Sequence, residues 1–447
     1  MNTNNRRHFL KTTAVGAAAV SALPIERFAL GASPGDTVKV ALIGCGGRGS
    51  GAADQALSTG DSVRLVAVAD IHEDRLNGSL NNLKGRHKEK VTVAKDAQFF
   101  GFDAYKKAIA LADLVILATP PGFRPMQFEE AVRQGKHVFM EKPVCVDAPG
   151  FRKVMAAAQE AKKKKLKVGV GLQRHHQAGY IETMKRLHGG AIGDIVAMRA
   201  YWNGNTPWVN RREDLDKRFG RKLTEMEYQL RNWYYFVWLC GDHICEQHIH
   251  NLDVINWVKS PEPGNYAHPV RARGNGGCET RKGKDYGEIF DHHVVEFDYA
   301  DGSTCFSQCR HQQGCWNDVS ESVIGTKGKS DLSRHIITGE NKWRHQAGGT
   351  NPYQQEHDNL FDAIRNDKPF NEAEQGAISS MTAVFGRMAT YSGKEITWDD
   401  AIKSNIDTMV KDIDKVSFAD ALNLEPQSRP GADGLYKLSV PGVHTTI

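Results

Sequence analysis

A glycine-rich loop placed directly after an apolar run constrains the fold of this 447-residue chain most strongly. The β-branched run at residues 38–43 is followed by Gly44-Cys45-Gly46-Gly47-Arg48-Gly49 and then by a helical stretch. In this context the first glycine permits a tight turn, the second lets the backbone approach a pyrophosphate, and the third allows close helix packing. N–H groups at the start of the helix bind phosphate. We therefore expect a dinucleotide to contact Gly44, Gly46, Gly47, Arg48 and Gly49.

An acidic residue about twenty positions after this loop indicates which dinucleotide binds. The apolar run at residues 63–69 ends in Asp70. A carboxylate at this position accepts a hydrogen bond from the ribose 2′-hydroxyl and repels a 2′-phosphate. The sequence therefore favours NAD over NADP.

The spacing of apolar runs predicts the domain organisation. Between residues 37 and 172, short apolar runs alternate with helical stretches, which is typical of parallel βαβ units. After Gly193 the runs are longer and alternate with polar residues, and Ala300-Asp301-Gly302 reads as a hairpin turn. We expect an α/β Rossmann domain at 37–172 and, at 173–400, an α+β C-terminal domain with a large, mainly antiparallel open-faced sheet. This second domain ends with a helical stretch near 353–392, and residues 401–447 form an irregular extension.

The N-terminus carries a targeting pattern. Arg6-Arg7 precede Phe9-Leu10-Lys11 and an uncharged, small-residue stretch at 12–24. This pattern resembles a twin-arginine export signal. We expect residues 1–32 to be a signal peptide, cleaved near Gly31 or Ala32, and the protein to be periplasmic or otherwise exported. The apolar stretch is too short for a stable membrane span in the mature protein.

Charge and cysteine content narrow the possible partners. The formal net charge is +5, and much of the excess lies in the first 30 residues, so the remaining chain is nearly neutral. A chain with almost no net charge offers no electrostatic basis for binding nucleic acid. The eight cysteines lack a regular framework spacing, so mostly free, buried thiols are expected. Pairing or metal binding by Cys240 with Cys245, or by Cys305 with Cys309 or Cys315, remains open.

Three further motifs resemble the signature of the Gfo/Idh/MocA oxidoreductases. They are Leu117-Ala118-Thr119-Pro120-Pro121, Gly135-Lys136-His137-Val138 and Glu141-Lys142-Pro143, and the resemblance extends from about Val38 to Trp398. It implies that Lys142 bridges a substrate hydroxyl and the nicotinamide, and that a cis peptide precedes Pro143. An ammonium group at the carboxyl edge of the sheet can polarise an oxygen atom. The motifs add Thr119, Pro120, Glu141 and Lys142 to the expected cofactor contacts.

The family also places an aspartate and a histidine four residues apart on a helix of the second domain. Alignment on His250-Asn251-Leu252-Asp253 puts His250 at the histidine and Glu246 at the aspartate, which departs from the family pattern. Residues four apart share one helical face, so we expect Glu246 to orient His250 as the base that takes the hydroxyl proton. Lys142, His250 and Glu246 are the expected catalytic residues. No metal is expected, although His243 lies on the same face and zinc remains an alternative.

Other polar and aromatic residues are expected around the cleft. Gln173 and Arg174 follow the sixth strand, where family members line the junction between cofactor and substrate. Aromatic faces mixed with amide donors suit sugar rings, so the expected substrate contacts are His176, Trp208, Asn232 and Trp233. A small aromatic core or a subunit interface would explain residues 201–238 equally well. His292, His293, Arg310 and His311 fit either a site or an oligomer face.

Together these features predict an exported NAD(P)-dependent oxidoreductase with a tightly bound cofactor, acting on a hydroxyl of a small carbohydrate, either a sugar or a polyol. By resemblance we expect a homo-oligomer formed through the C-terminal sheet. Outside the cytoplasm there is no soluble NAD pool, so the cofactor must be recycled in place. Two alternatives remain open. One is an NAD-dependent glycoside hydrolase that works by transient oxidation and elimination, and the other is a non-catalytic sugar-binding or sensing protein.

Overall fold

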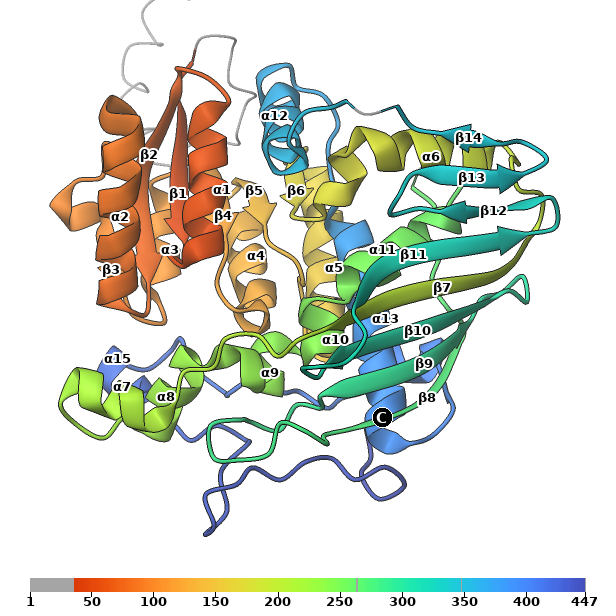
Figure 1. The fold of residues 1–447 in the computed structure, drawn as a ribbon. Coiled ribbons are helices and arrows are strands. Elements are labelled where there is room, and N and C mark those ends of the chain that lie inside the picture. The colour runs from red at the N-terminus through yellow and green to blue at the C-terminus, as the bar shows by residue number, and fades with distance from the viewer. Residues whose placement is uncertain (1–35, 263, 347, 447) are drawn as a thin grey trace, which may run out of the picture.

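A computed structural model describes residues 36–262, 264–346 and 348–446 of the chain. The expected signal peptide lies outside these residues. Figure 1 shows two sheets that lie side by side, a smaller one in the N-terminal part and a larger one built from the middle of the chain. Among the described residues, no helix is both long and apolar enough to cross a bilayer.

The first sheet has six parallel strands in the order β3-β2-β1-β4-β5-β6. The strands are β1 (Val38–Ile43), β2 (Val63–Asp70), β3 (Gln98–Phe100), β4 (Leu114–Leu117), β5 (His137–Met140) and β6 (Val168–Val170). The helices that alternate with them are α1 (Gly47–Ser58), α2 (Glu73–His87), α3 (Ala104–Ala110), α4 (Arg124–Arg133) and α5 (Ala148–Lys163). The strand order reverses between β1 and β4, and ligands of such sheets bind at this switch point. The predicted Rossmann architecture is confirmed.

The second sheet has nine strands in the order β14-β13-β12-β11-β7-β10-β9-β8-β15. Its strands are β7 (Ile195–Gly204), β8 (Arg271–Gly277), β9 (His292–Asp298), β10 (Thr304–His311), β11 (Asp318–Gly325), β12 (Gly328–Asp331), β13 (Ile336–Gly339), β14 (Trp343–Arg344) and β15 (Ile396–Thr397). β7 and β10 pair in parallel, whereas the other neighbours are antiparallel. The mainly antiparallel sheet is therefore confirmed, as is the hairpin turn at 300–302 between β9 and β10.

Helices cover one face of this second sheet. α13 (Ala373–Ser392) packs against β8 and β9, and α11 (Ile249–Val258) packs against β7 and β11. The expected helical stretch at 353–392 is two helices, because α12 (Pro352–Arg365) ends before Pro369, which cannot continue a helix. α12 lies beside α1 of the first domain (Figure 1). A segment from the C-terminal part of the chain thus packs against the nucleotide-binding domain.

The remaining helices between β6 and β8 are mostly short, and α6 lies apart from the others, next to β13 and β14 (Figure 1). They are α6 (Ala178–His188), α7 (Arg212–Phe219), α8 (Glu225–Arg231), α9 (Val237–Cys240) and α10 (His243–Glu246). α14 (Trp398–Lys403) follows β15, and beyond it the C-terminal residues contain α15 (Phe418–Ala421). This last segment runs next to α8, where Thr224 donates to the Leu422 carbonyl at 2.8 Å. All eight cysteines are free thiols, as expected.

Candidate active site

A cleft of about 680 Å³ lies at the carboxyl ends of the first sheet's strands. The second domain closes its other side. Of the expected cofactor contacts, the lining includes Gly44, Gly46, Gly47, Arg48, Asp70, Thr119, Pro120, Glu141, Lys142 and Gln173. Of the expected catalytic and substrate residues, it includes Lys142, Glu246, His250, Trp208 and Trp233. One cavity therefore brings together residues from both domains.

The glycine loop has the geometry that a dinucleotide cradle requires. Gly44 has φ +93°, and a Cβ there would lie 2.5 Å from the Ala118 carbonyl carbon. A Cβ on Gly49 would lie 1.9 Å from the Gly44 carbonyl oxygen, so only glycine lets α1 pack this closely. Added Cβ atoms on Gly46 and Gly47 would meet nothing within 4 Å, so the outer side of the loop is open to the cleft. The loop therefore fits a pyrophosphate at the N-terminus of α1.

Asp70 ends β2 at the mouth of the cleft. Its carboxylate accepts hydrogen bonds from the backbone N–H groups of Cys45 at 2.6 Å and His72 at 2.8 Å. Burial raises the pKa of Asp70, and these two donors oppose that effect. Arg75 and Arg231 line the same end, and an arginine in this position can accommodate a 2′-phosphate. The preference for NAD over NADP therefore stays a prediction.

Lys142 projects from the end of β5 across the boundary between the domains. The Lys142–Pro143 peptide is cis, as the family resemblance implies. The Lys142 Nζ donates to the Glu246 backbone carbonyl at 2.5 Å and lies 3.1 Å from the Glu246 carboxylate. Both side chains are largely buried. We expected Glu246 to orient His250, whereas in the structure its carboxylate pairs with Lys142.

The reason for this difference lies in the local backbone. We expected one helix through residues 246–250, but α10 ends at Glu246 and α11 begins at Ile249. The break means that Glu246 and His250 do not share one regular helical face. A continuous 3.6-residue repeat was therefore the wrong template for this segment.

His250 is 8% exposed and lines the cleft, and its ring stacks on Trp202 at 6.0 Å between centroids. Burial, together with the charges of Lys142 and Arg174, holds the pKa of His250 well below its usual range. The imidazole is therefore neutral at pH 7 and can accept a proton. Its Nδ1 has no hydrogen-bond partner within the part of the chain that the structure describes.

Two residues that line the cleft, Arg124 and Tyr353, were missed by the sequence reasoning. Arg124 is fully buried and donates to the Thr119 carbonyl at 2.7 Å and to the Glu141 carbonyl at 3.0 Å, which ties the ends of β4 and β5 together. Tyr353 of α12 lies under the Arg48 guanidinium, 5.1 Å from the ring centroid. Arg124 lay just after the Thr119-Pro120 motif, whereas nothing in the sequence placed Tyr353 near the glycine loop.

Four expected contacts lie behind the cleft lining. Gly49 lets α1 pack closely against the loop and does not line the cleft. Arg174 forms a buried ion pair with Glu321 and donates to the His250 carbonyl at 3.1 Å. His176 lies 3.2 Å from a carboxylate oxygen of Glu372. Asn232 is fully buried, and its amide donates to the Asp285 carbonyl at 2.8 Å. In this structure these groups support the walls of the site.

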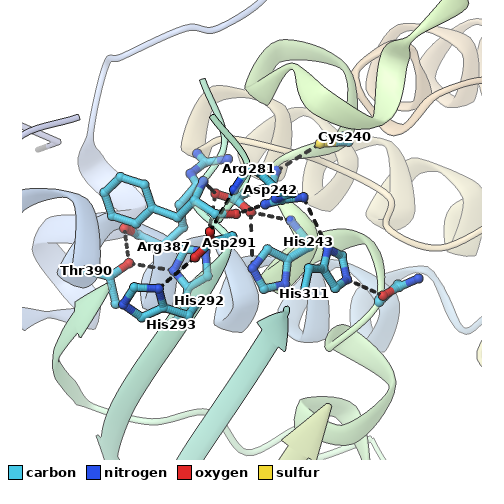
Figure 2. A network of polar contacts seen from close by, with 12 residues as sticks. Cys240, Asp242, His243, Arg281, Asp291, His292, His293, His311, Arg387 and Thr390 are labelled. Atoms are coloured by element: carbon cyan, nitrogen blue, oxygen red, sulfur yellow. Dashed lines mark hydrogen bonds and ion pairs between the residues drawn. The ribbon is translucent and has the colours of Figure 1, made fainter. Parts of the chain in front are cut away.

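The structure does not bring His243 together with Glu246 and His250, as the alternative zinc site would require. His243 is fully buried and its side chain belongs to a separate polar network with Asp242 and His293 (Figure 2).

The fold and the cleft define a dinucleotide-binding protein of the Rossmann type. Residues 38–171 match the model of the Gfo/Idh/MocA oxidoreductase family, described as having an NAD-binding Rossmann fold. This match confirms the resemblance to that family drawn from the motifs of the nucleotide-binding domain. Residues 3–22 match the twin-arginine translocation signal, which indicates export by that pathway.

Similar proteins include sugar-related and polyol-related enzymes. An inositol 2-dehydrogenase of Burkholderia cenocepacia is 26% identical over 224 residues, which cover 50% of this chain and 54% of that protein. A glycosyl hydrolase family 109 protein of Shewanella pealeana is 30% identical over 178 residues, covering 36% of this chain and 38% of that one. The chain thus spans about half the length, or less, of the curated relatives it matches.

The fold is shared with solved structures. A scyllo-inositol dehydrogenase of Lactobacillus casei, solved with bound NAD(H) and scyllo-inositol, superposes with a TM-score of 0.58 at 18% identity. The match covers 83% of this chain and 100% of that one, so both domains have counterparts there.

Proposed function

We propose that this protein is an exported, NAD-dependent oxidoreductase that acts on a hydroxyl group of a sugar or polyol and holds its cofactor tightly. The observation that carries this proposal is the meeting of Lys142, Glu246 and His250 in the same cleft as the glycine loop. Inositol dehydrogenases among the relatives and the NAD(H) complex among the structural neighbours support it.

The chain's own residues supply binding and proton transfer. A nicotinamide bound along the cleft would supply the hydride acceptor, with Gly46, Gly47 and Asp70 among the residues that hold the dinucleotide. Lys142 would polarise the substrate oxygen through its ammonium group, which Glu246 keeps in place. His250, neutral at pH 7, would accept the hydroxyl proton on a ring nitrogen.

The outer part of the cleft suits a carbohydrate. Trp208 and Trp233 both line it, with ring centroids 5.9 Å apart in an edge-to-face arrangement. Apolar ring faces of this kind contact the C–H faces of sugars, while polar neighbours such as Asn210 reach hydroxyl groups.

A homo-oligomer through the open face of the second sheet is part of the proposal. That face exposes large apolar side chains from three of its strands, which are Val294, Phe306 and Ile324. An exposed apolar surface of this kind marks a contact with another protein. Sedimentation of the purified protein tests it, and a monomer at micromolar concentration would contradict it.

The experiment that tests the activity is product analysis with native, exported protein. We expect bound dinucleotide to be released on denaturation and identified by mass spectrometry. A panel of sugars and polyols should then yield a carbonyl product together with reduced nicotinamide. Protein that carries no dinucleotide and takes none up from solution would overturn the proposal.

A glycoside hydrolase is the second candidate, and the similarity to the family 109 protein favours it. The same residues would take the proton of a sugar hydroxyl while the hydride on its carbon passes to the bound NAD, so that the neighbouring C–H becomes acidic and the leaving group is eliminated. Addition of water and return of the hydride would complete the cycle without net oxidation. Released aglycone without net redox change, with solvent deuterium incorporated at that carbon, would establish this activity. An oxidised sugar as the net product would establish the dehydrogenase instead.

A further inference from the structure

A second group of polar side chains lies buried in the C-terminal domain, separate from the cleft lining. Asp242 and His243 lie at the start of α10, and His293 lies on β9. Their exposed fractions are 0%, 0% and 1%. Figure 2 shows them within one polar network, and these three residues are called the Asp242 cluster below.

The spacing within the Asp242 cluster suits a shared cation. The His293 Nε2 lies 3.3 Å from the Asp242 Oδ2, and the His243 Nε2 lies 3.9 Å from the Asp242 Oδ1. One ligand atom from each of the three residues lies within 4.8 Å of the other two. Two ligands of a tetrahedral zinc ion, bonded at about 2.0–2.1 Å, lie roughly 3.3 Å apart. Small side-chain adjustments would therefore place all three atoms around one ion.

His243 is the member whose chemistry points to a ligand. Neither of its ring nitrogens has a hydrogen-bond partner among the described residues, although the side chain is fully buried. Burying an unpaired polar group is costly. The neighbouring His311 ring, 4.2 Å away between centroids, does not hydrogen-bond His243. Its two nitrogens contact Arg281 and Gln247 instead, at 3.3 and 2.7 Å.

The backbone of Asp242 gives a second, independent observation. Its φ of +75° and ψ of 163° lie in a region that normally requires glycine. The carboxylate is nevertheless held firmly, since its Oδ2 accepts from the Tyr391 hydroxyl at 2.6 Å and from the Phe290 N–H at 2.9 Å. Strained non-glycine positions tend to occur where the side chain has a function.

We propose that Asp242, His243 and His293 bind one divalent transition-metal ion of the zinc class. One carboxylate and two imidazoles are ligands that zinc prefers, and a water molecule would complete the coordination. Arg281 brings a positive charge next to the cluster, where its guanidinium contacts the His311 Nδ1 at 3.3 Å and the Phe290 carbonyl. A negative charge lies nearby on Asp291, whose carboxylate accepts from the backbone N–H of Arg281 at 3.2 Å. This assignment does not depend on the proposed redox activity.

The enclosed position indicates a structural ion. It would connect the segment leading to Glu246 with β9 and, through Tyr391, with α13. Because the twin-arginine pathway carries proteins that are already folded, the ion would enter before export, while the chain folds in the cytoplasm.

The test is elemental analysis of full-length protein produced in a host that exports it and dialysed against a weak chelator. We expect about one first-row transition-metal ion per chain in the wild type. His243→Asn and His293→Asn should each lower that content at least tenfold. Protein produced in cobalt-supplemented medium should show visible absorption bands of bound Co²⁺, and both variants should lose them.

Two matched controls keep the result specific. His357→Asn removes another buried histidine whose ring nitrogens have no partner among the described residues, and it should retain the metal. Glu246→Gln should retain the metal as well. Loss of metal in this variant would indicate that the ion binds in the cleft, and it would overturn the proposal. Circular dichroism and a cooperative thermal transition of each variant report whether it has folded.

Three further outcomes would also overturn it. They are wild-type protein without stoichiometric metal and without Co²⁺ bands, retention of the metal by folded His243→Asn, or retention by folded His293→Asn. If one of these variants fails to fold, the other, with Glu246→Gln as the control for the cleft, decides the question.

Discussion

The two halves of the cleft are built by different means. The dinucleotide half is shaped by backbone, because Gly44 and Gly49 have no room for side chains, while Gly46 and Gly47 leave the loop open to the cleft. The substrate half is shaped by side chains from distant elements, among them Trp208, Glu246 and His250. The dinucleotide half can therefore be recognised from local spacing in the sequence, whereas the substrate half exists only once the two domains have packed together.

Replacing Lys142 should separate the two halves most clearly. Lys142→Met should lower turnover by about 10³-fold, because it removes a polarising charge from the reacting oxygen. Bound dinucleotide should stay at wild-type stoichiometry, since the glycine loop is untouched. Single-turnover kinetics and mass spectrometry of the released cofactor measure the two effects. Equal loss of both would show that the halves are not independent.

A glycine substitution tests the dinucleotide half. Gly49→Ala would place a Cβ 1.9 Å from the Gly44 carbonyl oxygen, so the loop must shift. We expect dinucleotide affinity to fall about 100-fold, equivalent to roughly 2.7 kcal/mol. Gly51→Ala is the matched control on α1, because its nearest contact would be an ordinary 3.6 Å to Arg48. Calorimetry of both variants measures the difference, and equal affinities would refute the role of close packing.

Acid should lower the stability of α12, the helix from the C-terminal part of the chain that packs beside the dinucleotide half of the cleft. Burial lowers the pKa of His357 to about 3, whereas the unfolded chain takes up that proton near pH 6.5. The unfolded state therefore binds more protons between these values, and stability falls as the pH drops below about 6.5.

His357→Phe should keep the ring contact with Phe139, at 4.1 Å between centroids, and remove this titration. We expect it to recover roughly 2 kcal/mol of the stability lost between pH 7 and pH 5. Urea unfolding at both pH values measures this, with hydrogen exchange of α12 as the local reporter. An unchanged pH dependence in the variant would contradict the assignment.

Asp70 tests the choice of cofactor. Asp70→Asn should weaken NAD binding about tenfold and bring NADP affinity closer to that of NAD, because the charge that repels a 2′-phosphate is gone. Competitive titration with both cofactors measures the ratio. If the ratio does not change, Arg75 and Arg231 rather than Asp70 set the preference at this end of the cleft.

The smallest effect is expected at the rim of the substrate half. Trp208 is 46% exposed, so Trp208→Ala should raise KM by about three- to tenfold and leave kcat nearly unchanged. Trp316→Ala, at a position 60% exposed and outside the cleft lining, is the matched control and should change neither value. A fall in kcat would place Trp208 closer to the reacting atoms than proposed.

Predictability from sequence follows the same division. The Rossmann domain, the glycine loop and the Glu141-Lys142-Pro143 turn could be found because each depends on residues close together in the chain. The pairing of Glu246 with Lys142 could not, since it needs a helix break that periodicity does not reveal. Tyr353 lies about three hundred residues from the loop it supports, and only the packing of α12 on α1 brings it there.

The contact between Lys142 and Glu246 joins a residue of the nucleotide-binding domain to one of the substrate domain. Neither domain alone contains all residues of the proposed reactive centre. A chimera that grafts this Rossmann domain onto a foreign partner would still load its nucleotide, yet it would be inert unless the new partner presented an acceptor to the same ammonium group. If substrate domains are exchanged during evolution, the contact between Lys142 and the residue at position 246 must therefore be kept.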